Sequence, residues 1–327
     1  MSEINSYAPV RFLQGPHLET MIPGLFRKLK KIVPATEKVN TPDGDFLQLD
    51  WYLNDSSTLA IISHGLEGSS DRAYMKGMAK IFIDNNIDAL CWNYRGCGSE
   101  MNIKPRLYHS GATADLDTVV KVAAEKGYAQ IILIGFSLGG NITLKYVGEQ
   151  ENKLSPLIKA AITFSVPLDL AAGSRELLKP YNWLYSRRFL RNLKLKVKVK
   201  HQQFPELIKL NGLQEVNNLW KFDDLYTGPI HGFIDAEDYY YQCSAIRYLE
   251  GINIPCLIVN AKNDPFLPAE CYPVELIEKL PHIVFESPEH GGHVGFMELN
   301  REGYYWSEKR ALAFANLHLT ASQDSLS

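Results

Sequence analysis

The chain has 327 residues, of which 46% are hydrophobic and 22% are charged, and its formal net charge is −3. This length and composition are typical of a globular protein with one large domain or two small ones, and the charge gives no reason to expect nucleic acid as a partner. The longest apolar runs are strand-sized and fall well short of the roughly 20 residues that a membrane-spanning helix needs.

The start of the chain and the cysteines point to a reducing compartment. Residues 1–10 are polar and hold no apolar export segment, so we expect a cytoplasmic protein. The five cysteines are odd in number, scattered, and form no C-x-x-C pair. This pattern argues against a disulfide framework and against a zinc site, and it predicts free thiols and no bound metal.

Short apolar runs alternate with amphipathic helical segments along most of the chain. The first expected element is a hairpin over residues 40–52, turning at Pro42-Asp43-Gly44. Apolar runs then predict five buried strands, at residues 59–63, 89–94, 131–134, 160–164 and 256–260. Apolar residues at helical spacing lie between these runs. The alternation predicts an α/β fold, with a mostly parallel central sheet flanked by helices.

The alternation stops between residues 168 and 248. This stretch is longer than an ordinary crossover connection, is rich in aromatic residues, and carries a basic run from Arg187 to Lys200. Apolar residues alternate with lysines in that run, which leaves a strand open, but we favour a helix. We expect a mostly helical cap insertion over the ligand-binding edge of the sheet, its basic face in solvent or against anionic groups. The expected domains are 1–167 and 249–327 for the core and 168–248 for the cap.

A G-x-S-x-G motif at residues 135–139 is the first pattern that carries chemistry. The apolar run 131–134 leads into it, and a helix-compatible segment follows. Strand, turn and helix around this motif are typical of a nucleophile elbow, in which a sharp turn exposes a serine hydroxyl. Gly135 and Gly139 leave out the Cβ atoms that would clash in such a turn. We therefore predict that Ser137 is the nucleophile.

A serine nucleophile needs a base, which in this chain order is a histidine near the end of the sequence. His290 and His293 both lie just after the apolar run 283–285. Both stay candidates, and we prefer His293 because the glycines around it allow close approach to the serine loop.

The acid that orients the histidine should follow a late strand. Asp264 comes directly after the run 256–260 and is our prediction. Three further aspartates fall in the insertion and are weaker candidates: Asp224, Asp235 and Asp238. The order serine, acid, histidine is the one used by α/β-hydrolases.

A developing oxyanion needs two backbone N–H donors. Leu138 directly follows the nucleophile and supplies one of them by its position. The second is expected in the loop after the run 59–63, where the sequence is His64-Gly65-Leu66, and we predict the N–H of Leu66. This chemistry needs neither a metal nor an organic cofactor.

Several segments resemble one known family. Residues 93–100 (NYRGCGSE), 105–111 (PRLYHSG) and 292–296 (GHVGF) resemble motifs of the YheT-like α/β hydrolases, and residues 12–23 resemble the N-terminal segment of that family. These motifs are spread over nearly the whole chain. One departure is Glu19, where the family usually has glutamine. The same branch includes eukaryotic α/β-hydrolase-domain lipases and yeast ethyl ester synthase/esterases.

The resemblance implies the α/β-hydrolase fold, a triad of Ser137, Asp264 and His293, and hydrolysis of carboxylic esters with short- to medium-chain acyl groups or of lipids. Two alternatives stay open: an alcohol acyltransferase with the same triad, and a hydrolase-like protein that binds without turnover. The expected partner is a small-molecule or lipid ester. The sequence leaves membrane contact, the natural substrate and the oligomeric state open.

Overall fold

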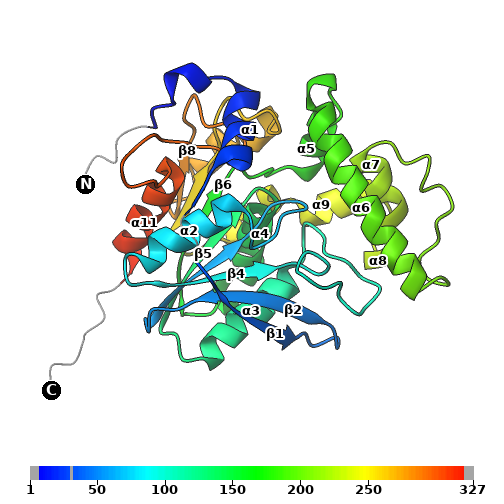
Figure 1. Cartoon of the computed structure of the whole chain (residues 1–327), viewed down its shortest axis with the longest axis horizontal. Coiled ribbons are helices and arrows are strands. Elements are labelled where there is room, and N and C mark those ends of the chain that lie inside the picture. The colour runs from blue at the N-terminus through cyan, green and yellow to red at the C-terminus, as the bar shows by residue number, and fades with distance from the viewer. Residues whose placement is uncertain (1–6, 30–31, 320–327) are drawn as a thin grey trace.

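The computed structural model describes residues 7–29 and 32–319, so part of the polar start on which the expectation of a cytoplasmic protein rests lies outside the described residues. Within them, the strands form one eight-stranded sheet in the order β1-β2-β4-β3-β5-β6-β7-β8 (Figure 1). The strands are β1 (Ala35–Asn40), β2 (Phe46–Tyr52), β3 (Thr58–Ser63), β4 (Asp88–Asn93), β5 (Gln130–Phe136), β6 (Ile158–Phe164), β7 (Cys256–Val259) and β8 (Ile283–Glu286).

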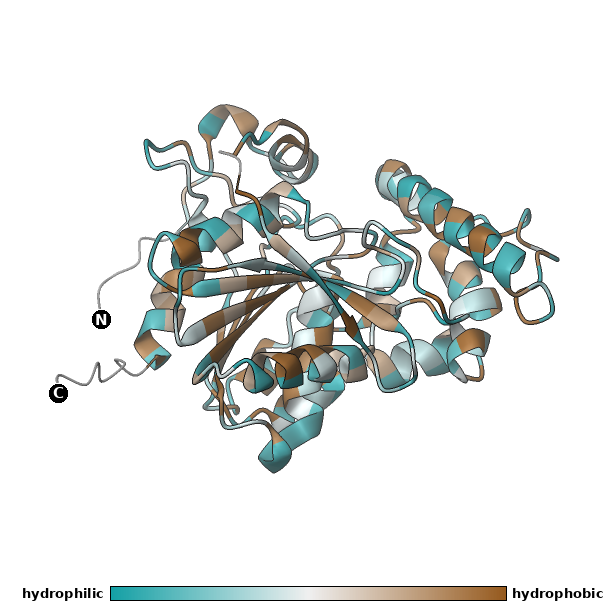
Figure 2. Cartoon of the chain, turned by 60° about the horizontal axis from the view of Figure 1, so that its bottom comes forward, coloured by the Kyte–Doolittle hydropathy of each residue, from teal (hydrophilic) through white to brown (hydrophobic). Residues whose placement is uncertain are grey.

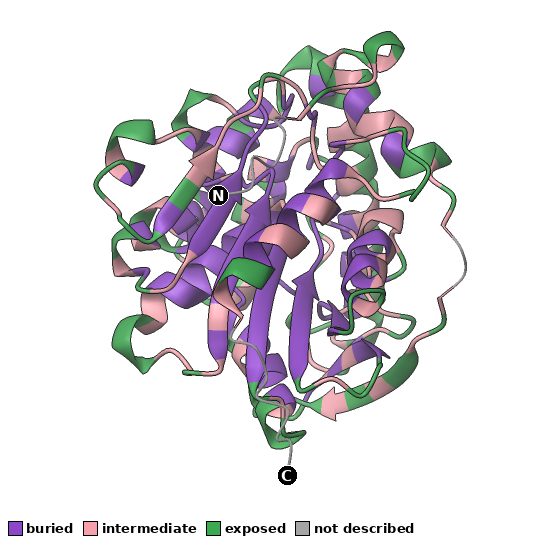
Figure 3. Ribbon diagram, turned by 90° about the vertical axis from the view of Figure 1, so that its left-hand side faces the viewer, coloured by how far each residue is buried: buried purple, intermediate pink, exposed green. Residues whose placement is uncertain are grey.

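The direction of the strands confirms the predicted mostly parallel sheet. β1 and β2 form the antiparallel hairpin, and β2 runs antiparallel to β4. Every other neighbouring pair is parallel. The central strands are buried along their whole length (Figure 3), as continuous apolar runs require when both faces are covered. The carboxyl ends of β3, β5, β7 and β8 therefore meet at one edge of the sheet.

Helices cover both faces of the sheet (Figure 2). The helices are α1 (Pro16–Phe26), α2 (Ala73–Ile83), α3 (Thr113–Glu125), α4 (Leu138–Gln150), α5 (Leu170–Glu176), α6 (Trp183–Gln203), α7 (Leu219–Phe222), α8 (Gly228–His231), α9 (Ala236–Cys243), α10 (Val274–Ile277) and α11 (Trp306–His318). On one face, α2 and α11 bury side chains such as Met78, Phe82 and Phe314. On the other, α3 and α4 bury Leu116 and Ile142. The two apolar layers hold the sheet between them.

Helices α5 to α9 lie between β6 and β7 and project beside the sheet (Figure 1). The basic run lies on the 21-residue helix α6, so the helix that we favoured is confirmed and the strand is wrong. Part of the insertion packs around its own small apolar core, which includes Leu193, Val197 and Phe222. The chain leaves and re-enters the sheet at one point, where the N–H of Ile246 donates to the carbonyl of Leu168 at 3.0 Å.

Helix α1 comes from the N-terminal segment, for which the apolar pattern gives no helix. Its contacts are with distant parts of the chain: Arg27, just after its end, forms an ion pair with Glu308 of α11 at 2.5 Å and stacks on the ring of Tyr305 at 3.7 Å. The side chains of Arg27 and Glu308 are 5% and 2% exposed. This buried pair fastens the helix above the edge of the sheet where the functional groups gather.

Candidate active site

The serine turn has the strained geometry of a nucleophile elbow. Ser137 lies between β5 and α4 with φ 53° and ψ −120°, a conformation that side chains other than glycine rarely adopt. A Cβ atom on Gly139 would lie 2.4 Å from the carbonyl oxygen of Ser63, and one on Gly135 would lie 2.5 Å from that of Gly139. The two glycines therefore allow the close backbone approach that this turn needs.

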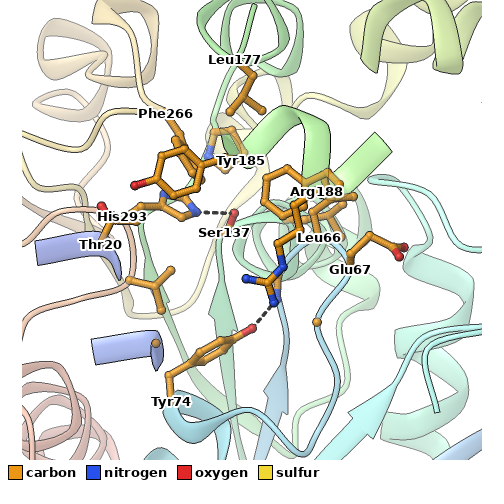
Figure 4. A pocket seen from close by; sticks show the side chains of 18 of the residues that line it. Thr20, Leu66, Glu67, Tyr74, Ser137, Leu177, Tyr185, Arg188, Phe266 and His293 are labelled. Carbon is orange, nitrogen blue, oxygen red and sulfur yellow. Dashed lines mark hydrogen bonds between the residues drawn. The ribbon is translucent and has the colours of Figure 1, made fainter. Parts of the chain in front are cut away.

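Three predicted side chains meet at the carboxyl edge of the sheet, and Figure 4 shows two of them, Ser137 and His293, joined by a dashed line. The Nε2 atom of His293 lies 2.9 Å from the Oγ atom of Ser137. The Nδ1 atom of the same ring lies 2.8 Å from the Oδ2 atom of Asp264, whose side chain is fully buried. The N–H of Phe266 donates to the Oδ1 atom of Asp264 at 2.9 Å, and the Phe266 ring packs 4.2 Å from the imidazole. A serine hydroxyl, an imidazole and a carboxylate thus form one hydrogen-bonded chain.

The rival candidates lie elsewhere. The Nδ1 atom of His290 faces Glu19 at 3.1 Å. Asp235 and Asp224 accept hydrogen bonds from backbone N–H groups inside the insertion, at Asp238 and Ala236 respectively. The carboxylate of Asp238 accepts from the N–H of Ile234. These three aspartates stabilise local turns of the insertion, and the structure brings none of them to His293.

The loop of residues 290–294, called the histidine loop below, rests on α1. Its Gly291 N–H donates to the Glu19 carboxylate at 2.5 Å, and its His293 N–H donates to Thr20 Oγ1 at 2.9 Å. Glu19 is only 6% exposed. The sequence analysis assigned no role to Glu19 or Thr20, although both lie in the segment that resembles the family's N-terminus. Their contacts show that α1 fixes the backbone that carries the imidazole.

Two core side chains complete the support of the histidine loop. Asn263 Oδ1 accepts from the N–H of Gly292, and Ser165 Oγ accepts from the N–H of Val294, each at 2.9 Å. Both lie just after strands, Ser165 after β6 and Asn263 after β7. Four successive N–H groups, those of residues 291–294, therefore have side-chain acceptors, which leaves the loop little freedom to move the imidazole.

The loop of residues 64–68, called the oxyanion loop below, presents one free N–H. The N–H of Gly65 donates to the Tyr74 hydroxyl and that of Glu67 to the Tyr108 hydroxyl, each at 3.0 Å. Between them, the N–H of Leu66 has no acceptor among the described residues, and neither has that of Leu138 at the start of α4. Both leucines line the cavity beside Ser137. Two unpaired donors next to a serine hydroxyl are suited to a developing oxyanion.

A buried ion pair joins the oxyanion loop to the insertion. The Nζ atom of Lys196 on α6 lies 2.6 Å from Oε1 of Glu67, and the side chains of the two residues are 14% and 4% exposed. The Tyr108 hydroxyl donates to the same carboxylate oxygen at 2.7 Å. Burial opposes the charge of Lys196, but the neighbouring Cys97 and Glu67 outweigh it and hold the lysine pKa above its ordinary value. The sequence analysis missed this pair.

His64, which opens the oxyanion loop, is a structural residue. It is fully buried, and burial lowers its pKa to about 3, so the imidazole is neutral at physiological pH. Its Nδ1 atom lies 2.8 Å from the carbonyl oxygen of Gly65, which makes Nδ1 the protonated nitrogen. The ring therefore holds the turn that carries Leu66 and is unsuited to act as a second base.

A largely apolar cavity of about 610 Å³ opens over Ser137. Side chains of the core, of α1 and of the insertion line it, among them Leu177, Tyr185 and Phe266 (Figure 4). The guanidinium of Arg188 also lines the cavity and forms no ion pair with any residue that the structure describes. Within the described residues no group of acidic, histidine or cysteine side chains could hold a metal ion.

Comparison with known proteins shows the family to which this fold belongs. A family model described as the alpha/beta hydrolase fold matches residues 61–298. YheT of Escherichia coli (strain K12) is 36% identical over 89% of this chain and 87% of its own length. Phospholipase ABHD3 of Mus musculus is 32% identical over 90% of this chain and 74% of its own. A monoacylglycerol lipase of Saccharomyces cerevisiae is 30% identical over 81% of this chain and 60% of its own.

Solved structures show the same fold at low sequence identity. The Pyrococcus furiosus esterase Pf2001 aligns with a TM-score of 0.61 at 17% identity and covers 90% of this chain and 96% of its own. The α/β hydrolase GrgF from Penicillium sp. sh18 aligns with a TM-score of 0.59 at 18% identity and covers 88% and 99%. Among the described residues, no helix has the length and apolar character needed to span a membrane.

Proposed function

This chain belongs to the α/β-hydrolase family, and we propose that it is a serine hydrolase that cleaves carboxylic esters through an acyl-enzyme on Ser137. The observation that carries the proposal is the unbroken contact from Ser137 to His293 to Asp264, at 2.9 and 2.8 Å, beside the unpaired N–H groups of Leu66 and Leu138. A nucleophile, a base with its orienting carboxylate, and two oxyanion donors are the groups that acyl transfer needs.

The proposed reaction has two halves. His293 takes the proton of Ser137 as the hydroxyl oxygen attacks the ester carbonyl, and the N–H groups of Leu66 and Leu138 donate to the resulting oxyanion. The alcohol then leaves with the proton from His293, and the acyl group stays on Ser137. Water attacks this ester with His293 again as base, releases the acid and restores the serine. Asp264 keeps the imidazole oriented and stabilises its charged form.

The cavity favours esters with an apolar acyl chain. Its lining is mostly apolar, and its volume of about 610 Å³ is in the range of pockets that enclose a small ligand. The relatives include proteins named as a phospholipase and a monoacylglycerol lipase. We therefore propose short- to medium-chain acyl esters or lipids as the substrate class, with residues 168–248 acting as the cap that sets the accepted chain length.

A panel of p-nitrophenyl esters from acetyl to palmitoyl, run on wild type and Ser137→Ala, tests the proposal. We expect the variant to lose about 10³-fold or more in kcat, because loss of a triad nucleophile has effects of that size. A fluorophosphonate probe should label the folded wild type on Ser137 and leave the variant unlabelled. Equal rates in both proteins, or no adduct on Ser137, would refute the mechanism and favour a protein that binds without turnover.

A further inference from the structure

Exposed apolar side chains lie on two elements that are far apart in the sequence and that both contribute residues to the lining of the cavity. Leu25 and Phe26 end α1 and are 65% and 68% exposed, while Trp183 and Leu184 begin α6 and are each 58% exposed. Tyr181, in the turn before α6, is 52% exposed. We call these five residues the mouth rim. Such an apolar cluster around an opening is costly in water and marks a surface that meets an apolar partner.

The two parts of the mouth rim are held together as one surface. The ring of His17 on α1 stacks on that of Tyr185 on α6, with the ring centres 5.8 Å apart, and its Nδ1 atom lies 3.3 Å from the Tyr185 hydroxyl. Leu25 and Leu184 both line the cavity that holds Ser137. In Figure 1, α1 and the start of α6 both lie at the top of the molecule. A flat partner can therefore touch both at once.

The charge next to the mouth rim selects the kind of partner. Helix α6 contains seven lysines and arginines and no acidic residue. Arg187, Arg188 and Arg191 are exposed in its first half and form no ion pair within residues 7–29 and 32–319. The Arg187 guanidinium lies 5.0 Å from the Trp183 ring. Exposed aromatic and aliphatic side chains beside unpaired arginines are typical of segments that lie in the headgroup region of a bilayer.

From these observations we propose that the mouth rim docks this protein on an anionic lipid surface, with the cavity opening facing the bilayer. The apolar side chains enter the headgroup region, and the three arginines bind lipid phosphates. Docking itself does not depend on catalysis. The advantage of docking for catalysis rests on the proposed function. If the protein hydrolyses ester lipids, a docked molecule receives its substrate from the bilayer without the lipid crossing water.

Sedimentation with phosphatidylcholine vesicles, with and without phosphatidylglycerol, tests the docking. The Ser137→Ala variant is used, so the lipids stay intact and the result is independent of the proposed hydrolysis. We expect the Ser137→Ala protein to bind the vesicles that contain phosphatidylglycerol. When Phe26→Ser and Trp183→Ser are introduced into this protein, we expect its partition coefficient to fall about tenfold. Raising NaCl to about 0.5 M should also weaken binding. Leu53→Ser with Ile234→Ser, at exposed sites of 58% and 86%, is the matched control and should bind as before.

Three outcomes would overturn the docking proposal: no binding to anionic vesicles, equal binding to both kinds of vesicle, or equal losses in the rim and control variants. A dimer in solution that Phe26→Ser with Trp183→Ser dissociates would assign the mouth rim to a second copy of this chain instead. In the background with Ser137 intact, the rim variant should keep wild-type kcat/KM on p-nitrophenyl acetate, which shows that it is folded. If p-nitrophenyl acetate is not hydrolysed at all while vesicles are bound, the hydrolase proposal alone fails.

Discussion

The histidine loop and the oxyanion loop lie on either side of Ser137, and they are held in different ways. The histidine loop donates its backbone N–H groups to side chains of α1 and the core, with Glu19 lying 272 residues from its partner Gly291. The oxyanion loop donates two backbone N–H groups to the Tyr74 and Tyr108 hydroxyls, and its Glu67 side chain also forms a buried ion pair with Lys196 of the insertion. The backbone of the histidine loop is thus held by residues outside the insertion, and the insertion contacts the imidazole indirectly, through Tyr185 and the Phe266 ring. The oxyanion loop, by contrast, is joined directly to α6 through Glu67.

The two loops carry different parts of the proposed reaction: the histidine loop carries the base that activates Ser137, and the oxyanion loop carries the Leu66 N–H that binds the oxyanion. The backbone hydrogen bonds of the histidine loop do not involve the insertion, whereas the Glu67 side chain of the oxyanion loop has its cation on α6. Interactions that strengthen in the transition state raise kcat, whereas those made equally with bound substrate lower KM. Disturbing the Glu67–Lys196 pair should therefore affect kcat, and disturbing Glu19 should affect the whole site and the stability of the fold.

Among changes to the supports of the two loops, the largest effect is expected for Glu19→Ala, which tests the attachment of the histidine loop. The change leaves the buried N–H of Gly291 without its acceptor and frees the loop that carries His293. We expect kcat/KM for p-nitrophenyl butyrate to fall about 100-fold, since small displacements of a catalytic group have effects of this order. The melting temperature should fall as well.

Glu19→Gln is the matched control for that change. Glutamine is the usual residue of the family at this position, and its amide oxygen can accept the Gly291 N–H. Activity should stay within about threefold of wild type. A Glu19→Gln protein as inactive as Glu19→Ala would mean that the negative charge, and not the hydrogen bond to the loop, is what matters.

A smaller effect is expected when the oxyanion loop is separated from the insertion. Lys196→Met and Glu67→Gln should each lower kcat about tenfold with KM nearly unchanged, because a displaced oxyanion donor loses part of the 10²- to 10³-fold effect of removing one. The unfolding free energy should fall by about 3 kcal/mol for Lys196→Met, which leaves a buried carboxylate without its cation. Steady-state kinetics and urea unfolding measure the two effects.

The double variant sharpens this result. If the two residues act through their contact, Lys196→Met with Glu67→Gln should lose less than the product of the two single losses. If the loss of the double variant equals the product of the two single losses, the two residues do not act through their contact. A rise in KM with kcat unchanged would also contradict the coupling, because the pair would then only shape the cavity.

The smallest effect concerns the pH dependence of the insertion. The Asp223 carboxylate accepts from the Thr227 and Tyr240 hydroxyls, each at 2.5 Å, and burial raises its pKa to about 6. The native state then binds a proton more tightly than the unfolded chain, so the stabilisation is present at low pH and is lost as the pH rises through about 6. Wild type should lose about 1 kcal/mol of stability between pH about 5 and about 7, relative to Asp223→Asn.

Urea unfolding of both proteins at the two pH values measures this difference. It bears on the comparison of the two loops because the oxyanion loop is joined to the insertion by a direct ion pair. A stability difference that is the same at both pH values would show that Asp223 does not titrate in this range.

The parts of the site that the sequence predicted are those set by local pattern. Buried parallel strands are continuous apolar runs, and the serine, aspartate and histidine each follow such a run. Because parallel strands end at a common edge, the positions of Ser137, Asp264 and His293 after their strands are enough to bring them together. Their roles in catalysis stay proposals that the variants above test.

The supports of the two loops could not be predicted in this way. Glu19 and Lys196 act through contacts with residues 272 and 129 positions away, and neither lies in an apolar pattern that fixes its direction. A lone glutamate in the N-terminal segment and one lysine among seven basic residues on α6 look like surface charges in the sequence. Only the packing of α1 and of the insertion makes them buried partners.

The hydrogen bond between Leu168 and Ile246 holds the two ends of the insertion next to each other. Since the insertion departs and returns at adjacent positions, replacing it by a segment of another length changes the closure entropy only slightly. We therefore expect the sheet, with Ser137, Asp264 and His293, to tolerate a segment of another length at this point, and such a segment would change the lining of the cavity. Such a segment would need to supply a cation for the buried Glu67 carboxylate.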